Sequence, residues 1–166
     1  MLPAYIPNPV AAVFGRGTPI DLGRNFSDGR RLFGDGKTYR GLIAGILAGI
    51  VIGLLQIQAQ AMFDLSYLPV QTLLSISLLA VGALLGDLVK SFFKRRLGKE
   101  RGSKWPLADM YDLVIGAFVL LLILDPSWLF SQVTLAAFIV ILILTPILHR
   151  LTNIIGYIIK VKEVPW

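Results

Sequence analysis

Two long stretches of this chain are apolar and carry no charge. Residues 41–63 and 68–86 contain no Asp, Glu, Lys or Arg. A transmembrane helix needs roughly 20 apolar residues to cross a hydrocarbon core of about 30 Å. Because 55% of the residues are hydrophobic and the mean hydropathy is +0.73, the chain has more apolar surface than a soluble domain can bury. We therefore predict an all-α polytopic membrane protein with a single transmembrane domain over residues 1–166.

Further apolar segments set the expected number of helices. Two more runs cover residues 107–124 and Trp128–Leu148. The N-terminal segment 2–14 is apolar but short and contains three prolines, so a spanning helix, a re-entrant piece and an interfacial segment are all compatible with it. We count it as a span, which gives about five transmembrane helices. Residues 151–160 are expected to extend the last helix along the inner leaflet.

The cations of the chain lie in three of its polar segments. Six lie in the loop 15–40, seven in the stretch 90–104 and three beyond the last run, which accounts for all 16. By the positive-inside rule, the loops of about 15–40 and 94–106 then face the cytoplasm, and the protein is a multi-pass protein of the cell membrane. The net charge of +6 is thus a topology signal and does not indicate nucleic-acid binding.

Four glycines are spaced four residues apart in the first long run: Gly41, Gly45, Gly49 and Gly53. This spacing places them on one helix face, where a neighbouring backbone can approach closely. The strip predicts helix packing, either within the chain or in a homodimer.

Three aspartates mark the inner ends of two neighbouring runs. Asp87 closes one run, and Asp109 and Asp112 open the next. Because a helix over 107–124 is only about 27 Å long, Asp112 lies roughly 7–8 Å inside the bilayer boundary. An ionised carboxylate there costs several kcal/mol unless it is paired, metal-bound or in a wet cavity. With no cysteine and one histidine in the chain, we predict a Mg²⁺ site made of these three aspartates.

Two cations and a serine share a helix face with Asp87. Lys90, Ser91 and Lys94 follow it at i+3, i+4 and i+7. The stripe fits an intrahelical ion pair, with Lys94 reaching to the lipid headgroups. It equally fits a carboxylate and two cations that converge on one ligand.

The loop 15–40 is glycine-rich, mixed in charge and too long for a simple connection. Its segment 34–38 resembles the end of a P-loop, but Arg31 stands where that motif needs glycine and no strand precedes it. Arg30, Arg31 and Lys37 can still hold phosphates together with exposed backbone N–H groups. An ordinary basic loop that holds headgroups is the alternative.

The charged junction contains an ordered set of residues: Asp87, Ser91, Lys94, Arg95, Lys99, Pro106, Asp109 and Asp112. This order resembles the cytidylyltransferase signature of CDP-diacylglycerol synthases, in which a serine and a Lys-Arg pair precede a lysine, a proline and two aspartates. Two features depart from that signature: Glu100 stands where relatives have Asp, and their His-Gly-Gly triplet is absent. The small size and the loop Thr18–Thr38 make the chain similar to the archaeal branch, the CDP-archaeol synthases.

The resemblance implies a CTP-dependent cytidylyltransferase of archaeal ether phospholipid synthesis. Its partners would be CTP and an isoprenoid ether-lipid phosphate, 2,3-bis-O-geranylgeranylglycerol 1-phosphate, and its products the CDP-lipid and diphosphate. Asp87, Asp109 and Asp112 would be the Mg²⁺ and catalytic residues. The expected CTP- and phosphate-binding residues are Arg24, Asn25, Asp28, Arg30, Arg31, Asp35, Lys37, Ser91, Lys94, Arg95, Lys99 and Lys104.

Two other functions are compatible with a small membrane protein that carries aspartates at its inner face. A lipid-headgroup transferase of the CDP-alcohol class requires the pattern D-x-x-D-G-x-x-A-R, whereas Leu113 follows Asp112 here. A small transporter requires polar groups or broken helices at the bilayer midplane. The centres of the runs are apolar apart from Gln56, Gln58, Ser75 and Ser77. These features disfavour both functions. A small polytopic transporter, or another lipid-headgroup transferase with a Mg²⁺-dependent aspartate site, is nevertheless the alternative to a cytidylyltransferase.

Overall fold

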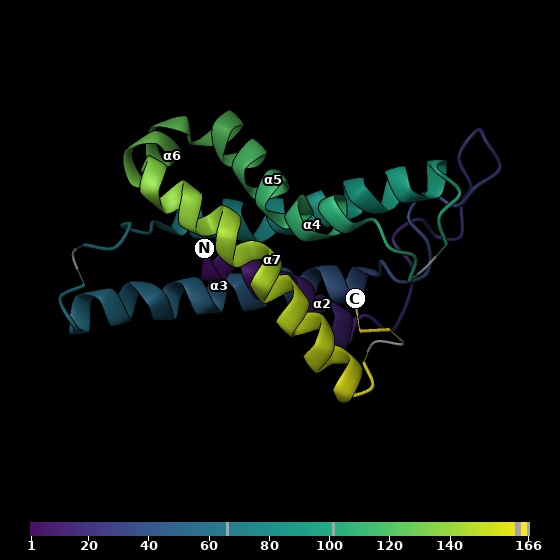
Figure 1. The fold of residues 1–166 in the computed structure, drawn as a ribbon, viewed down its shortest axis with the longest axis horizontal. Helices are drawn as coiled ribbons and strands as arrows, with labels where there is room; N and C mark the ends of the chain where they lie inside the picture. Colours follow the sequence, from purple (N-terminus) through teal and green to yellow (C-terminus); the bar gives the residue numbers. More distant parts are fainter. Residues whose placement is uncertain (66, 101, 162–163, 166) are drawn as a thin grey trace.

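The computed structural model describes residues 1–65, 67–100, 102–161 and 164–165. These residues form helices and no strand: α1 Leu2–Tyr5, α2 Pro7–Phe14, α3 Tyr39–Met62, α4 Leu73–Arg96, α5 Pro106–Leu124, α6 Pro126–Gln132 and α7 Leu135–Ile158 (Figure 1). The predicted all-α polytopic class is confirmed. Arg101 and Lys162, two of the cations counted in the basic segments, lie outside the described residues.

Three of the four long helices start at residues whose side chains accept hydrogen bonds from the first backbone N–H groups, and the fourth starts at a proline, which has no N–H group. Thr38 accepts a hydrogen bond from Gly41 N at the start of α3, and Thr134 accepts one from Ala137 N at the start of α7. Thr72 and Ser75 form a capping box at α4, and Pro106 occupies the first turn of α5. All four helices are long and apolar enough to cross a membrane.

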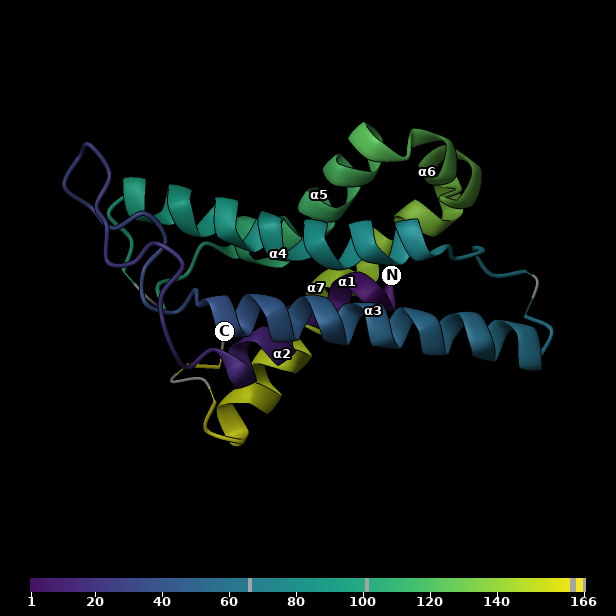
Figure 2. The same ribbon diagram turned by 180° about the vertical axis from the view of Figure 1, so that it is seen from behind.

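The N-terminal segment folds into two short helices instead of one. α1 and α2 each have a proline in the first turn, and together they are about 20 Å long at about 1.5 Å per residue. They pack against α3 and α4, with Pro3, Ala4 and Pro7 buried (Figures 1 and 2). The expected fifth helix is thus present as a shorter element, and "about five" spans is an approximate count.

The last apolar run differs from its prediction. The sequence predicted one span over Trp128–Leu148, but α6 ends at Gln132 and α7 begins at Leu135. Thr134 has an extended backbone and caps the new helix, so the chain turns inside the apolar run. The break falls at the polar residues Ser131, Gln132 and Thr134, but the apolar residues on either side outweigh them in a hydropathy average. The predicted extension over 151–160 is helical as far as Ile158.

The glycine strip of α3 packs within the chain. Gly41, Gly45, Gly49 and Gly53 are all buried. A Cβ atom at Gly45 would come within 2.8 Å of Pro7 O, and one at Gly53 within 2.7 Å of Ile76 Cβ. The strip therefore serves the contacts of α3 with α2 and α4, and a homodimer would have to use another surface.

Helix α4 lies at the centre of the fold and carries one half of the charged junction. Ile76, Leu79, Ala80 and Ala83 are completely buried on it. Its C-terminal end reaches the first loop, residues 15–38, so that both long loops gather at one end of the molecule (Figures 1 and 2). The packing of α4 thereby fixes the position of the predicted site.

Candidate active site

Small residues bring α4 and α5 into backbone contact next to the aspartates. Gly82, Gly86 and Gly116 lie at the crossing, where a Cβ atom at Gly86 would collide with the backbone oxygen of Asp112. Gly116 would collide in the same way with Gly82 O. This close approach sets Asp87, the neighbour of Gly86, beside Asp112 on the other helix.

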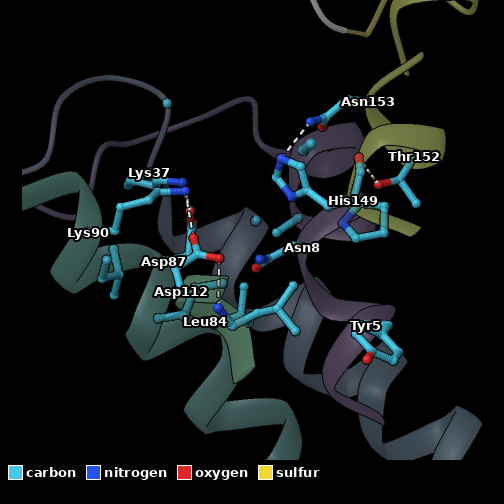
Figure 3. A pocket seen from close by; sticks show the side chains of 18 of the residues that line it. Tyr5, Asn8, Lys37, Leu84, Asp87, Lys90, Asp112, His149, Thr152 and Asn153 are labelled. Atoms are coloured by element: carbon cyan, nitrogen blue, oxygen red, sulfur yellow. Dashed lines mark hydrogen bonds and ion pairs between the residues drawn. The ribbon is translucent and has the colours of Figure 1, made fainter. Parts of the chain in front are cut away.

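The three predicted aspartates converge on one lysine. Lys90 Nζ lies 2.6 Å from Asp112 Oδ2, 3.1 Å from Asp87 Oδ1 and 3.5 Å from Asp109 Oδ1. Lys37, from the end of the first loop, forms an ion pair with Asp87, and Lys94 forms one with Asp109 at 2.6 Å. We call Asp87, Asp109, Asp112, Lys37, Lys90 and Lys94 the carboxylate–lysine cluster. Figure 3 shows Asp87 and Asp112 side by side with Lys37 and Lys90 next to them.

Asp112 is the most deeply buried carboxylate of the cluster, with 6% of its surface exposed. Its Oδ1 accepts a hydrogen bond from Leu113 N at 2.6 Å. Among the described residues, Oδ2 receives no well-directed hydrogen bond and is held by the charge of Lys90. Because an unpaired buried carboxylate is costly, Asp112 depends on a cation at this position.

The oxygen atoms of the three aspartates suit a hard divalent cation, but the ammonium group of Lys90 lies between them. Mg²⁺ prefers carboxylate oxygens, and Asp87, Asp109 and Asp112 supply three of them from two helices. Within the described residues, no group of three such side chains forms a ready-made metal site. The residue types therefore fit Mg²⁺, provided that the Lys90 ammonium moves away from the three carboxylates.

Three cavities of different character meet at Lys90. One of about 200 Å³ lies among the helices and is lined by Asn8, Asp112 and His149 (Figure 3). A second, of about 690 Å³, lies on the loop side and is lined by Lys37, Ser91 and Lys94, among others. A third, of about 450 Å³, is almost wholly apolar and runs along α4 and α5. Lys90 lines all three.

Asp21 organises the first loop. Its carboxylate accepts hydrogen bonds from the Arg31 side chain at 2.6 and 3.2 Å. It also accepts from the backbone N–H groups of Gly23, Phe33 and Gly34, at 3.1, 3.0 and 2.9 Å. Burial opposes the charged form, but Arg31 and the three N–H groups outweigh it and hold the pKa of Asp21 well below its usual range. The loop is therefore ordered around a buried charge.

Arginines fasten this loop to the end of α4. Arg30 Nη1 donates to Arg95 O at 3.3 Å, Arg96 Nη2 donates to Arg31 O at 2.6 Å, and Arg95 Nε donates to Phe33 O at 3.3 Å. We call Arg30, Arg31, Arg95 and Arg96 the arginine set. Because it fixes the loop to α4, Lys37 at the end of the loop reaches Asp87.

Comparison with known proteins finds relatives that match the whole chain. The whole chain, residues 1–166, matches the family model described as "CarS-like: CDP-archaeol synthase". The CDP-archaeol synthases of Methanoculleus marisnigri and Methanoregula boonei are each 64% identical over 166 residues, with 100% of both chains covered. The chain belongs to the CDP-archaeol synthase family.

A solved structure supports the same assignment. It belongs to an intramembrane enzyme for archaeal membrane lipid biosynthesis, is 39% identical, and superimposes with a TM-score of 0.67 over 87% of this chain and 86% of that one. A member of the CDP-archaeol synthase family is a nucleotidyltransferase, so the chain is an enzyme and acts as a cytidylyltransferase of archaeal lipid synthesis. Its four long apolar helices and the intramembrane relative make it a multi-pass membrane protein.

Part of the predicted site of this CDP-archaeol synthase family member comes together at the cluster. Asp87, Asp109 and Asp112 meet there with Lys37 and Lys94. The Ser91 hydroxyl donates to Asp87 O at 2.8 Å and lines the loop-side cavity. The catalytic and phosphate-binding roles of these residues remain predictions.

Other predicted phosphate-binding residues are engaged in holding the loops. Asp28 pairs with Arg96 at 2.8 Å, and Asp35 pairs with Arg31 at 2.8 Å. Arg30, Arg31, Arg95 and Lys99 border a separate cavity of about 450 Å³.

The remaining three predicted residues lie in the two loops. Arg24 and Asn25 are exposed in the first loop, and Lys99 Nζ donates to Lys104 O at 3.1 Å in the second. A role in phosphate binding stays a prediction for all of these residues.

Sequence reasoning missed several residues that line the cavity among the helices. Asn8, Thr145, His149 and Asn153 come from α2 and α7, far from the charged junction in sequence. His149 and Asn153 are joined by a hydrogen bond of 2.7 Å. No spacing pattern links α2 to α7, so only the packing of the helices reveals this wall. Lys90 did carry a signal, since it lies three residues after Asp87 on the same helix face.

Proposed function

We propose that the chain transfers the cytidylyl group of CTP to 2,3-bis-O-geranylgeranylglycerol 1-phosphate and releases diphosphate. The supporting observation is the meeting of three unlike cavities at the carboxylate–lysine cluster. The loop-side cavity, bordered by Lys37, Lys94 and Arg95, suits a nucleotide triphosphate. The cavity among the helices suits the phosphate headgroup, and the apolar cavity suits an isoprenoid chain.

The reaction that this arrangement supports is an in-line displacement at the α-phosphorus of CTP. A phosphate oxygen of the lipid forms the new bond to that phosphorus, and the bond between the α- and β-phosphates breaks. Diphosphate leaves with the electron pair of the broken bond. A phosphate monoester is already ionised at neutral pH, so the site has to supply positions and positive charge and needs no general base.

The lysines of the cluster are placed to supply that charge. Lys37 from the first loop and Lys94 from α4 border the loop-side cavity, and Lys90 borders all three cavities. Ammonium groups at such positions hold the triphosphate and stabilise the charge that develops on the leaving diphosphate. Asp87, Asp109 and Asp112 would hold Mg²⁺, which neutralises phosphate charge when bound.

The site faces the cytoplasm in this proposal. The first loop, the last turns of α4 and the segment after α4 carry most of the cations, and they lie at the end of the molecule where the cluster is found. The positive-inside rule places this end on the cytoplasmic side of the cell membrane, where CTP is available.

A reconstituted assay tests the proposal. Purified protein in detergent is given radiolabelled CTP, Mg²⁺ and the unsaturated ether-lipid phosphate, and the lipid extract is analysed for label. We expect a labelled CDP-lipid and one diphosphate for each product molecule, and neither when the lipid or Mg²⁺ is omitted. A folded sample that forms no CDP-lipid would refute the proposed function.

A further inference from the structure

Lys90 contacts more carboxylates than a single ion pair would require. Its Nζ approaches all three carboxylates, at 2.6, 3.1 and 3.5 Å, whereas Lys37 and Lys94 each pair with one. Its side chain is 14% exposed and is thus largely enclosed by these acids. The ammonium occupies the position on which oxygen ligands from α4 and α5 converge.

We propose that Lys90 is an internal counter-ion that holds the place of the divalent metal until the nucleotide arrives. In this arrangement a metal ion binds tightly only together with the nucleotide, because the phosphates must take over the charge of Lys90. The inference rests on the proposed function, since it assumes that the metal and a nucleotide share this site.

The charge balance of the cluster supports this dependence. Three carboxylates face three ammonium groups, so the described side chains of the cluster are neutral together. A divalent cation added alone would face three positive charges within a largely buried site, where charges are poorly screened. The triphosphate of a nucleotide brings more negative charge than the metal brings positive charge. Metal and nucleotide together are therefore far better accommodated than the metal alone.

The loop-side cavity offers a second position for the ammonium group of Lys90. Lys90 lines the loop-side cavity together with Lys37, Lys94 and Arg95, where phosphates would lie in the proposed function. A lysine has a flexible stem, so its ammonium can leave the carboxylates for a phosphate without movement of α4. Lys37 and Lys94 lack this position, because neither of them touches Asp112.

Equilibrium dialysis with Mn²⁺, which takes the same oxygen ligands as Mg²⁺, tests the proposal. The nucleotide is present at the same free concentration on both sides, so that chelation in solution cancels, and the lipid is omitted so that CTP is not consumed. We expect weak Mn²⁺ binding to the wild-type protein alone and binding tighter by about tenfold or more with CTP. Equal affinity with and without CTP would overturn the proposal, and this arm needs no variant.

Substitutions test the role of Lys90 itself. Lys90→Met removes the charge but keeps an unbranched, flexible side chain of similar size, so we expect Mn²⁺ to bind without CTP about tenfold or more tightly than in the wild type. Lys90→Arg keeps the charge and is expected to bind Mn²⁺ as weakly as the wild type. Lys160→Met, the same change at an exposed position outside the cluster, should leave Mn²⁺ binding unchanged.

Further measurements locate the metal and check folding. Asp112→Asn in the Lys90→Met background should abolish the gained affinity, and Mn²⁺ should raise the unfolding temperature of Lys90→Met more than that of the wild type. If Lys90→Met is folded and binds Mn²⁺ no better than the wild type, the proposal is wrong. These readouts do not involve turnover, so a failure of CDP-lipid synthesis in the wild type would be recognised separately.

Discussion

The arginine set and the lysines of the cluster lie at the same end of the molecule but do different work. Arg30 donates to backbone oxygens at the end of α4, and Arg95 and Arg96 donate to backbone oxygens of the two loops. The guanidinium of Arg96 also lies 4.9 Å from the ring centre of Phe26 and 4.7 Å from that of Phe92. Lys37, Lys90 and Lys94 instead pair with the carboxylates of the cluster beside the loop-side cavity.

The difference follows from the chemistry of the two side chains. The planar guanidinium has five donors in a rigid fork, which can tie several backbone oxygens together. The ammonium is a compact charge on a flexible stem and can change partners when a ligand arrives. In this protein the arginines therefore hold the loop in place, whereas the proposed function assigns the binding of phosphates to the lysines.

The largest loss of activity is expected when a carboxylate that faces the lysines is removed. Asp112→Asn removes the negative charge that faces Lys90 and, in the proposed function, a ligand of the metal. We expect CDP-lipid formation to fall by about a thousandfold or more, because metal and phosphate charge would no longer be balanced at the reacting atoms. Size-exclusion profile and unfolding temperature should show a folded protein. Near-normal turnover would remove Asp112 from the catalytic machinery.

The second effect concerns the crossing that brings the two halves of the cluster together. In Gly86→Ala the added Cβ would collide with Asp112 O, so α4 and α5 must separate. We expect a loss of about 1–3 kcal/mol in stability, and turnover lower by about 10–100-fold because the carboxylates move apart. Activity and thermal unfolding of the purified variant measure both. Leu74→Ala, at an exposed position of α4 away from the cavities, is the control for a general effect of changing α4.

These two positions show what the sequence could and could not predict. Asp87, Asp109 and Asp112 were recognisable because charge inside an apolar run is costly, and the four long helices because hydropathy reports membrane burial directly. Gly86 and Gly116 look like ordinary helix residues until two backbones meet there. The roles of Arg30 and Arg95 could not be separated from that of Lys37, because sequence shows a charge but not its partner. The wall formed by Asn8 and His149 depends on tertiary packing alone.

A smaller effect is expected within the arginine set. Arg96→Lys keeps the charge but loses the fork that reaches Arg30 O and Arg31 O at 3.0 and 2.6 Å. We expect stability to fall by about 1–3 kcal/mol and turnover by only a few fold, since Lys37 still reaches Asp87 in most molecules. Denaturant unfolding of the variant and the wild type measures the change in stability, and steady-state kinetics with CTP measures the change in turnover. Arg150→Lys, exposed on α7, is the matched control. A loss of turnover as large as that of Asp112→Asn would place Arg96 in the catalytic machinery. The division of roles between arginines and lysines would then be wrong.

The smallest effect concerns the pH dependence of the first loop. Because Arg31 and backbone N–H groups hold the pKa of Asp21 below its usual value of about 3.9, its charged form stabilises the folded loop. That contribution is complete above the unfolded pKa and is lost as the pH falls below about 4 towards the folded pKa. We expect exchange protection of the Phe33 and Gly34 amides, corrected for intrinsic rates, to be constant from about pH 8 to 5 and to fall only below about pH 4.

The variant Asp21→Asn isolates this contribution from the other acids of the loop. It should show lower protection of the Phe33 and Gly34 amides at neutral pH, because these N–H groups lose their charged acceptor. It should also lack the step in protection below about pH 4. If the wild type already loses protection between pH 8 and 5, or if the variant keeps the acid step, another group controls the loop.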